Sequence, residues 1–168
     1  ITTSVGRLFD AVAAIVGLRE RANFEGQAAM ELEFSIGSEQ SDERYRFEIV
    51  DYRLQDGTQR EHRPGFVVDW SHLVLGVLED VRRGEAVSRV SLKFHNTLCE
   101  IIIAVARLLG EQRVVLTGGC FQNKYLTERT INRLKEEGFR PYWHQRVPPN
   151  DGGIALGQVY AFLRGNGG

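Results

Sequence analysis

Two short glycine-containing segments hold the polar groups of this 168-residue chain that are best placed to bind an anion. In the first, the apolar residues 114–116 lead into residues 117–123 (TGGCFQN), and a helical pattern starts directly after them. Unpaired N–H groups and the helix dipole favour negative charge at such a start. Gly118 and Gly119 would let the backbone approach a phosphate or nucleotide closely. A plain strand-to-helix turn explains the same glycine pair, and the pattern alone leaves both interpretations open.

The second segment, residues 148–153 (PPNDGG), also opens a helical pattern, so we expect both corners to contribute to one site. Asp151 is either a capping carboxylate or a hard oxygen ligand for a divalent metal ion. The local sequence pattern alone favours the capping role. Asn123 has a similar pair of interpretations. It is the N-cap of the following helix, or its amide contacts a ribose or phosphate oxygen.

Other polar residues carry weaker signals. Asp10 lies among apolar residues of the first helix, where a carboxylate needs a partner or lines a cleft. Gly26 precedes the second helix and forms another backbone corner or a capping loop. A lone helical histidine such as His95 is more often structural than catalytic. Cys120 has no adjacent base in the sequence, which favours a packing role for its side chain.

The elements that must position these residues follow from hydrophobic periodicity. Helices are expected at about 5–16, 25–36, 71–83, 86–109, 124–136 and 153–163. Strands are expected at 45–54, 66–70, 113–117 and 140–144, the first two forming a hairpin around a turn at 55–58. The second half alternates helices with strands, which predicts an α/β fold of a single lobe spanning residues 1–168.

Composition restricts the function further. Hydrophobic residues make up 42% and charged residues 26% of the chain, which is typical of a globular protein. A net charge of −1 gives no support for a nucleic-acid or anionic-membrane partner. Two cysteines without metal-ligand spacing fit a reducing, cytoplasmic location. No apolar run is long enough to cross a membrane, and the start at Ile1 without a methionine suggests a fragment of a longer protein.

Five segments together closely resemble the C-terminal part of the HypF family of hydrogenase maturation carbamoyltransferases. They run in family order from one end of the chain to the other, whereas about residues 38–70 carry no recognisable motif. The matching segments are residues 3–14 (TSVGRLFDAVAA), 24–29 (FEGQAA), 94–98 (FHNTL), 117–123 (TGGCFQN) and 146–158 (RVPPNDGGIALGQ).

The resemblance implies the second lobe of an actin-like, sugar-kinase-like (ribonuclease H-like) ATPase fold. In HypF-like proteins a YrdC-like domain would make carbamoyl-adenylate from ATP and carbamoyl phosphate. The domain containing this lobe would then pass the carbamoyl group to the C-terminal cysteine of the partner HypE. The resulting thiocarboxamide later becomes a cyanide ligand of [NiFe] hydrogenase.

Carried over by motif, Gly118, Gly119 and Asn123 would contact the adenylate. Asp10 and Gly26 match positions that would touch its ribose. Asp151 matches the family's metal-ligand aspartate, so the resemblance overrides the capping interpretation. The family's histidine metal ligands belong to the first lobe, and the 168 residues alone are therefore expected to have an incomplete metal site and no adenylate-forming activity.

Three alternatives remain. The near-neutral net charge and the sequence of residues 146–153 (RVPPNDGG) argue against the related tRNA threonylcarbamoyl transferases. A small-molecule O-carbamoyltransferase shares the implied fold but differs in its corner motifs. The third alternative is an inert docking lobe for HypE. A comparison of carbamoyl transfer by the full-length protein and by the isolated chain would distinguish it.

Overall fold

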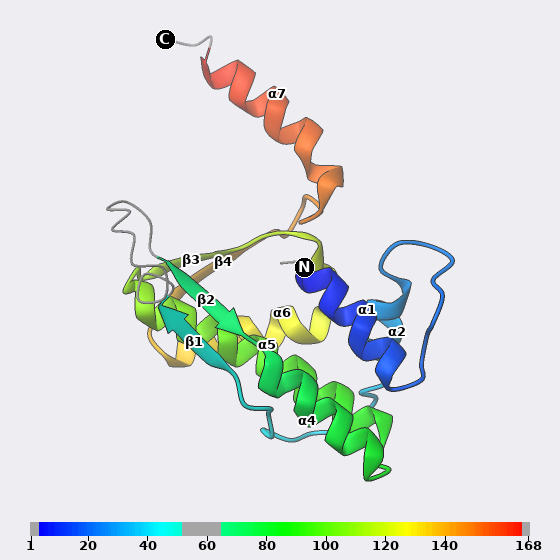
Figure 1. The fold of residues 1–168 in the computed structure, drawn as a ribbon. Coiled ribbons are helices and arrows are strands. Elements are labelled where there is room, and N and C mark those ends of the chain that lie inside the picture. Colours follow the sequence, from blue (N-terminus) through cyan, green and yellow to red (C-terminus); the bar gives the residue numbers. More distant parts are fainter. Residues whose placement is uncertain (1–3, 52–64, 166–168) are drawn as a thin grey trace.

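The computed structural model describes residues 4–51 and 65–165 of the chain. Its body is built around one long helix, α5 (Val87–Leu109), with other helices and two small sheets packed beside it (Figure 1). Eleven residues of α5 are buried, because its apolar positions recur at helical spacing and meet neighbours on several sides. No helix within the described ranges is long and apolar enough to span a bilayer.

The N-terminal helices form one side of this body. Helix α1 (Val5–Ile15) packs against α2 (Gln27–Phe34) and α4 (Ser71–Arg82), and α4 packs against α5. Helix α2 begins two residues later than the predicted start at 25. Gly26 is the cause, because its φ of +82° is left-handed and interrupts the helical backbone.

The predicted hairpin is confirmed. Strands β1 (Glu48–Asp51) and β2 (Phe66–Asp69) pair antiparallel. The first strand starts later than the predicted residue 45, because the backbone N–H of Tyr45 donates to Thr97 Oγ1 of α5 at 2.8 Å. The expected turn at 55–58 and the end of the predicted strand at 52–54 lie outside the described residues.

The second half contains a β–α–β unit. Strand β3 (Arg113–Leu116) leads through the 3₁₀ turn η1 (Gly119–Gln122) into α6 (Lys124–Glu136), and then β4 (Arg140–Trp143) pairs parallel with β3. Helix α6 packs against α5. The predicted α/β character is thus confirmed, although the described strands form two separate two-stranded sheets and not one continuous layer.

The core joins α1, α2, α4, α5 and α6 with the end of β3. The largest fully buried side chains of the described residues are Phe9, Val12, Leu32, Leu73, Val77, Val90, Leu92, Phe94, His95, Ile103, Leu116 and Leu134.

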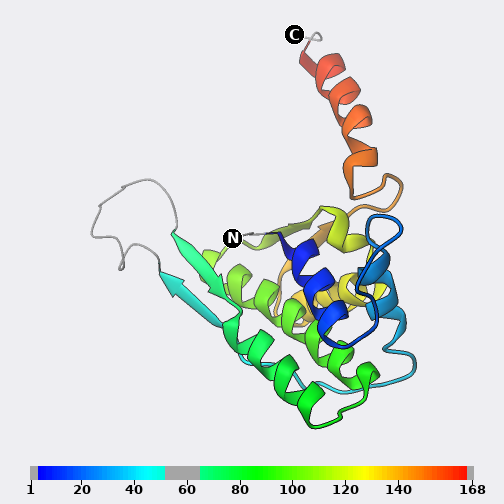
Figure 2. The same ribbon diagram turned by 45° about the vertical axis from the view of Figure 1, so that its right-hand side comes forward.

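The last helix differs from the rest of the chain. After the 3₁₀ turn η2 (Asp151–Gly153), helix α7 (Ile154–Gly165) extends away from the body in both views (Figures 1 and 2). No residue of α7 is buried. Six of its large hydrophobic side chains are each at least 55% exposed: Ile154, Leu156, Val159, Tyr160, Phe162 and Leu163.

Candidate functional site

The two glycine corners lie side by side, as expected from the sequence. The backbone N–H of Gly118 donates to the carbonyl oxygen of Pro149 at 2.8 Å. A Cβ atom added to Gly119 would lie 4.0 Å from the Cβ of Asn150. The cause is the parallel pairing of β3 and β4, because the carboxyl ends of parallel strands meet at one edge of a sheet.

The first corner leaves a backbone donor unused. Gly118 has a φ of +105°, a conformation that side chains with a Cβ rarely adopt, so glycine is required there by the backbone itself. The η1 turn is closed by hydrogen bonds from Phe121 N to Gly118 O (3.0 Å) and from Asn123 N to Cys120 O (3.2 Å). Within the described chain, the N–H of Gly119 has no hydrogen-bond partner. It is a donor suited to an anion.

The start of α6 is less accessible than the sequence suggested. Asn123 is the N-cap, since its Oδ1 accepts a hydrogen bond from Leu126 N at 2.8 Å. Glu33 of α2 accepts a second one from Tyr125 N at 3.0 Å. The protein's own side chains therefore occupy these first-turn N–H groups, and the donor left for a ligand lies in the preceding turn at Gly119. The capping interpretation of Asn123 is confirmed, while its contact with a nucleotide stays a prediction.

In the second corner, the residue that caps the turn and the residue with an unpaired carboxylate are two different residues. Asn150 is its N-cap, because its Oδ1 accepts from Gly152 N at 3.1 Å. The capping interpretation of Asp151 is therefore wrong. Asp151 is exposed, and among the described residues its carboxylate makes no hydrogen bond or ion pair. Within the same residues, no group of three or more His, Cys, Asp or Glu side chains is arranged to hold a metal ion.

Asp10 and Gly26 lie on neighbouring elements. Helix α1, which carries Asp10, packs against both η1 and α2. The Asp10 carboxylate is 43% exposed and lies 3.4 Å from Arg7 Nη1. Gly26 is exposed at the start of α2. The fold therefore brings α1 beside the first corner, and a ribose contact by either residue remains a prediction.

One polar pair at this edge was missed by sequence reasoning. Thr117 Oγ1 lies 3.0 Å from His144 Nε2, and both side chains are exposed. The two residues directly follow β3 and β4. Their positions after two strands of one β–α–β unit were a usable signal, because such residues meet at the carboxyl edge of a sheet.

His95 and Cys120 have the structural environments expected of them. His95 is fully buried, and burial lowers its pKa to about 4. Cys120 is half-buried against the core, and burial raises the pKa of its thiol. The thiol is therefore protonated at neutral pH and is a poor nucleophile.

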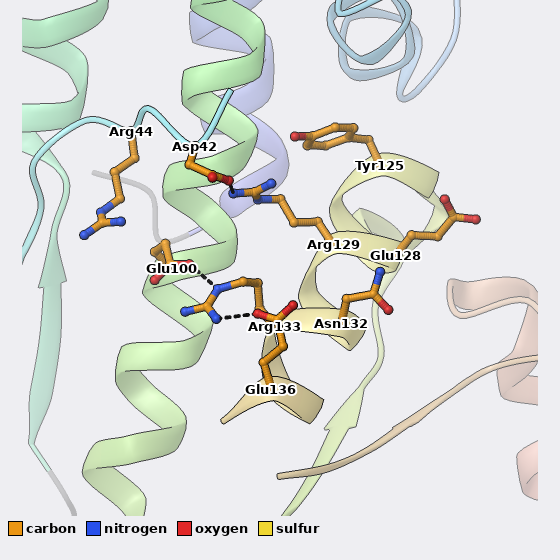
Figure 3. Close-up of a pocket in the computed structure, with 9 residues that line it drawn as sticks. All are labelled: Asp42, Arg44, Glu100, Tyr125, Glu128, Arg129, Asn132, Arg133 and Glu136. Carbon is orange, nitrogen blue, oxygen red and sulfur yellow. Dashed lines mark hydrogen bonds and ion pairs between the residues drawn. The ribbon is translucent and has the colours of Figure 1, made fainter. Parts of the chain in front are cut away.

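A cavity of about 590 Å³ lies elsewhere, between α5 and α6 (Figure 3). Arg129 donates to Asp42 at 2.8 Å and Arg133 to Glu100 at 2.9 Å, so much of its charge is internally paired. The hydrogen bond from Arg129 holds the pKa of Asp42 below its usual value. No residue predicted to bind nucleotide or metal lines this cavity, whose wall is formed by Asp42, Arg44, Glu100, Tyr125, Glu128, Arg129, Asn132, Arg133 and Glu136.

Comparison with known families shows which class of protein has this fold and these corners. The family model described as "Carbamoyltransferase, Kae1-like Domain, second subdomain" matches residues 1–158, and the chain belongs to this family. The curated relatives it matches include the carbamoyltransferases HypF. The protein of Synechocystis sp. is 39% identical over 164 residues, covering 98% of this chain and 20% of the relative. That of Rhizobium leguminosarum bv. viciae is 38% identical over 165 residues, covering 94% and 19%.

Solved structures agree with this assignment. A crystal structure of full-length HypF in the phosphate- and nucleotide-bound form matches with a TM-score of 0.83 and 40% identity, covering 98% of this chain and 21% of that one. HypF of T. kodakarensis has the same fold, with a TM-score of 0.73 at 24% identity over 96% of this chain and 20% of that one. The chain thus spans about a fifth of the length of these relatives.

Proposed function

We propose that this chain is the second lobe of a HypF-type carbamoyltransferase domain with an actin-like, sugar-kinase-like fold, and that its two glycine corners bind the nucleotide part of carbamoyl-adenylate. The observation that carries the proposal is the contact between the corners, made by the 2.8 Å hydrogen bond from Gly118 to Pro149. It leaves the Gly119 N–H as an unused donor beside the exposed turn at 150–153. The nucleotide-bound form of a 40% identical relative supports the same ligand class.

The lobe would act within a longer protein. The matching family model is described as a second subdomain, and the relatives are about five times as long as this chain. Helix α7 supports this view, because an exposed apolar surface of this kind marks a site of contact with other protein surface. Both cysteines are free, which fits a reducing cytoplasm.

The proposed reaction needs little covalent chemistry from this chain. Carbamoyl-adenylate would be made from ATP and carbamoyl phosphate in another domain. The thiolate of the C-terminal cysteine of HypE would attack the carbamoyl carbon, forming the S–C bond of a thiocarboxamide on the route to a hydrogenase cyanide ligand, while the C–O bond to phosphate breaks and AMP leaves. The lobe's contribution would be to orient the adenylate and stabilise charge on the departing phosphate.

Asp151 would hold a divalent metal ion at the edge of this site. Its exposed and unpaired carboxylate is the kind of hard oxygen ligand that such ions prefer, and the remaining ligands would come from the first lobe. When bound, the metal ion would supply Lewis-acid polarisation of an oxygen atom.

Replacing Gly119 with valine tests the nucleotide site in the intact protein. The added Cβ meets only the Cβ of Asn150, at 4.0 Å, so the fold should survive while close approach of a phosphate is blocked. Pyrophosphate release during adenylate formation should continue, carbamoyl transfer to HypE should stop, and circular dichroism should be unchanged. Gly119→Ala should give an intermediate loss. Transfer at the wild-type rate by Gly119→Val would refute the proposed site.

A further inference from the structure

We propose that His95 is a positioning residue for the nucleotide corner. In this proposal, a neutral imidazole protonated on Nδ1 accepts the amide hydrogen of Asn123 and thereby holds the η1 turn and the start of α6 in binding geometry. The inference rests on the proposed function, because it assigns to His95 the support of that same corner. His95 itself is fully buried and does not touch the ligand.

The hydrogen bonds of His95 define its protonation state. Its Nδ1 lies 2.7 Å from the carbonyl oxygen of Ser91, one turn earlier in α5. A carbonyl oxygen only accepts, so Nδ1 must carry the hydrogen and Nε2 must be the acceptor. At 2.9 Å from Nε2 lies Nδ2 of Asn123, which is a donor. Both ring nitrogens of the neutral histidine are therefore satisfied.

The tautomer of His95 also determines the orientation of the Asn123 amide. With Nδ2 directed at His95, Oδ1 is left to accept from Leu126 N at 2.8 Å. If His95 were doubly protonated, two donors would face each other and this orientation would be lost. If His95 were replaced by an apolar residue, the Asn123 NH₂ group would be buried without its partner, since Asn123 is only 8% exposed.

The surroundings of the ring connect it to three helices near the corner, α1, α2 and α6. Phe9 of α1 and Tyr125 of α6 contact it edge-on, with ring centroids 5.4 Å and 5.7 Å from that of His95. Ser91, whose carbonyl it binds, also donates its hydroxyl to Leu32 O of α2. Helix α1 carries Asp10, while α2 and α6 directly follow Gly26 and Asn123. This aromatic enclosure excludes water and favours the neutral ring.

Asn123 connects His95 to the proposed ligand site through only a few residues. Asn123 directly follows the η1 turn, and its backbone N–H closes that turn on Cys120 O at 3.2 Å. The unused Gly119 N–H begins the same turn. In this proposal, loss of the bond between Asn123 and His95 loosens the η1 turn that presents the anion donor. A core histidine without this role would affect stability but not ligand affinity.

The test measures the affinity of intact protein for the non-hydrolysable analogue adenosine 5′-(β,γ-imido)triphosphate by calorimetry. His95→Leu fills the buried position with an apolar side chain but removes the Nε2 acceptor. It should weaken binding at this site roughly tenfold. His95→Gln should stay within about threefold of the wild type, because its Oε1 can accept from Asn123. Ile103→Ala, at a buried position two turns further along α5 from His95, is the matched control. It should lower the melting temperature without changing affinity.

Three results would overturn the inference. They are wild-type affinity in His95→Leu, an equal loss of affinity in Ile103→Ala, and a further loss when His95→Leu is added to Asn123→Ala. If His95→Leu does not fold, ¹⁵N-histidine NMR of the wild type decides instead. It must show the Nδ1–H tautomer at neutral pH, and an Nε2–H tautomer refutes the proposal. If Gly119→Val binds the analogue normally, the proposed nucleotide site itself fails, whatever the His95 variants do.

Discussion

Asn150 and Asp151 are adjacent in sequence, but their side chains have different partners. The Asn150 amide accepts from Gly152 N at 3.1 Å and caps the turn that leads into α7. The Asp151 carboxylate points to no partner among the described residues. We therefore expect this carboxylate to be free to bind a cation in the intact protein.

Asp151→Asn separates metal binding from stability. Because Asn150 is the cap, we expect the variant to change the free energy of unfolding by less than about 0.5 kcal/mol. In the intact protein it should reduce metal affinity roughly 10- to 100-fold or more, together with carbamoyl transfer. The readouts are metal analysis of the purified protein and a transfer assay. Asn150→Ala is the opposite control, with a stability loss of about 1 kcal/mol from the lost cap. Full metal content and activity in Asp151→Asn would exclude Asp151 as a ligand.

His95 should make the stability of the chain depend on pH. Its pKa is about 4 in the folded chain and about 6.5 when unfolded, so the unfolded state binds more protons between these values. The stability contributed by the neutral ring is therefore present above pH 6.5 and is lost as the pH falls towards 4. Between pH 7 and pH 4.5 the wild type should lose roughly 2 kcal/mol more than His95→Gln in urea unfolding. Equal losses would mean that His95 is not buried in its neutral form.

Some of these residue roles were predictable and others were not. Asn123 directly precedes a helical pattern, so its capping role follows from local sequence. The partners of the same corner lie far away along the chain: His95 is 28 residues from Asn123, and Glu33 is 92 residues from Tyr125. Such bonds depend on how α2, α5 and α6 pack, which no local pattern encodes.

Among the elements, the turn at 148–153 is held by close backbone packing. A Cβ on Gly153 would lie 2.7 Å from the carbonyl oxygen of Pro148, whereas one on Gly157 in α7 would meet nothing within 4 Å. The space available for a side chain therefore differs between the two positions. Gly153 is required by its neighbours, and Gly157 is not.

Gly153→Ala should disturb the second corner. The clash with a backbone oxygen should cost about 1–3 kcal/mol and shift Asn150 away from Gly119. Nucleotide affinity of the intact protein should fall with it. In the isolated chain, where α7 is exposed, Gly157→Ala should be neutral or stabilising by up to about 1 kcal/mol. Thermal unfolding and calorimetry measure both effects, and similar behaviour of the two variants would show that the close approach at Gly153 has no consequence.

The helices and strands themselves were largely predictable from periodicity. Helices α5 and α6 lie within one residue of their predicted limits, because their apolar positions recur regularly and glycines follow their ends. The start of α2 and the start of β1 were not. Gly26 adopts a left-handed conformation, and Tyr45 forms a long-range bond to Thr97, and neither choice is visible in a hydrophobic pattern.

At the scale of the whole molecule, the described residues form one packed body with one helix outside it. Helix α7 extends away from this body in Figure 1, and it follows directly from the second glycine corner. Its large hydrophobic side chains are exposed. We therefore expect any protein surface that covers α7 to lie next to the proposed nucleotide site. This placement fits a site that lies between two lobes of a longer chain.

The central claim is that the two glycine corners bind one nucleotide. A crystal structure of the intact protein with adenosine 5′-(β,γ-imido)triphosphate tests it most directly. We expect a phosphate or ribose oxygen about 3 Å from the Gly119 N–H, with the turn at 150–153 in contact with the same ligand. Clear density for the nucleotide elsewhere in the protein, with none between these corners, would contradict it.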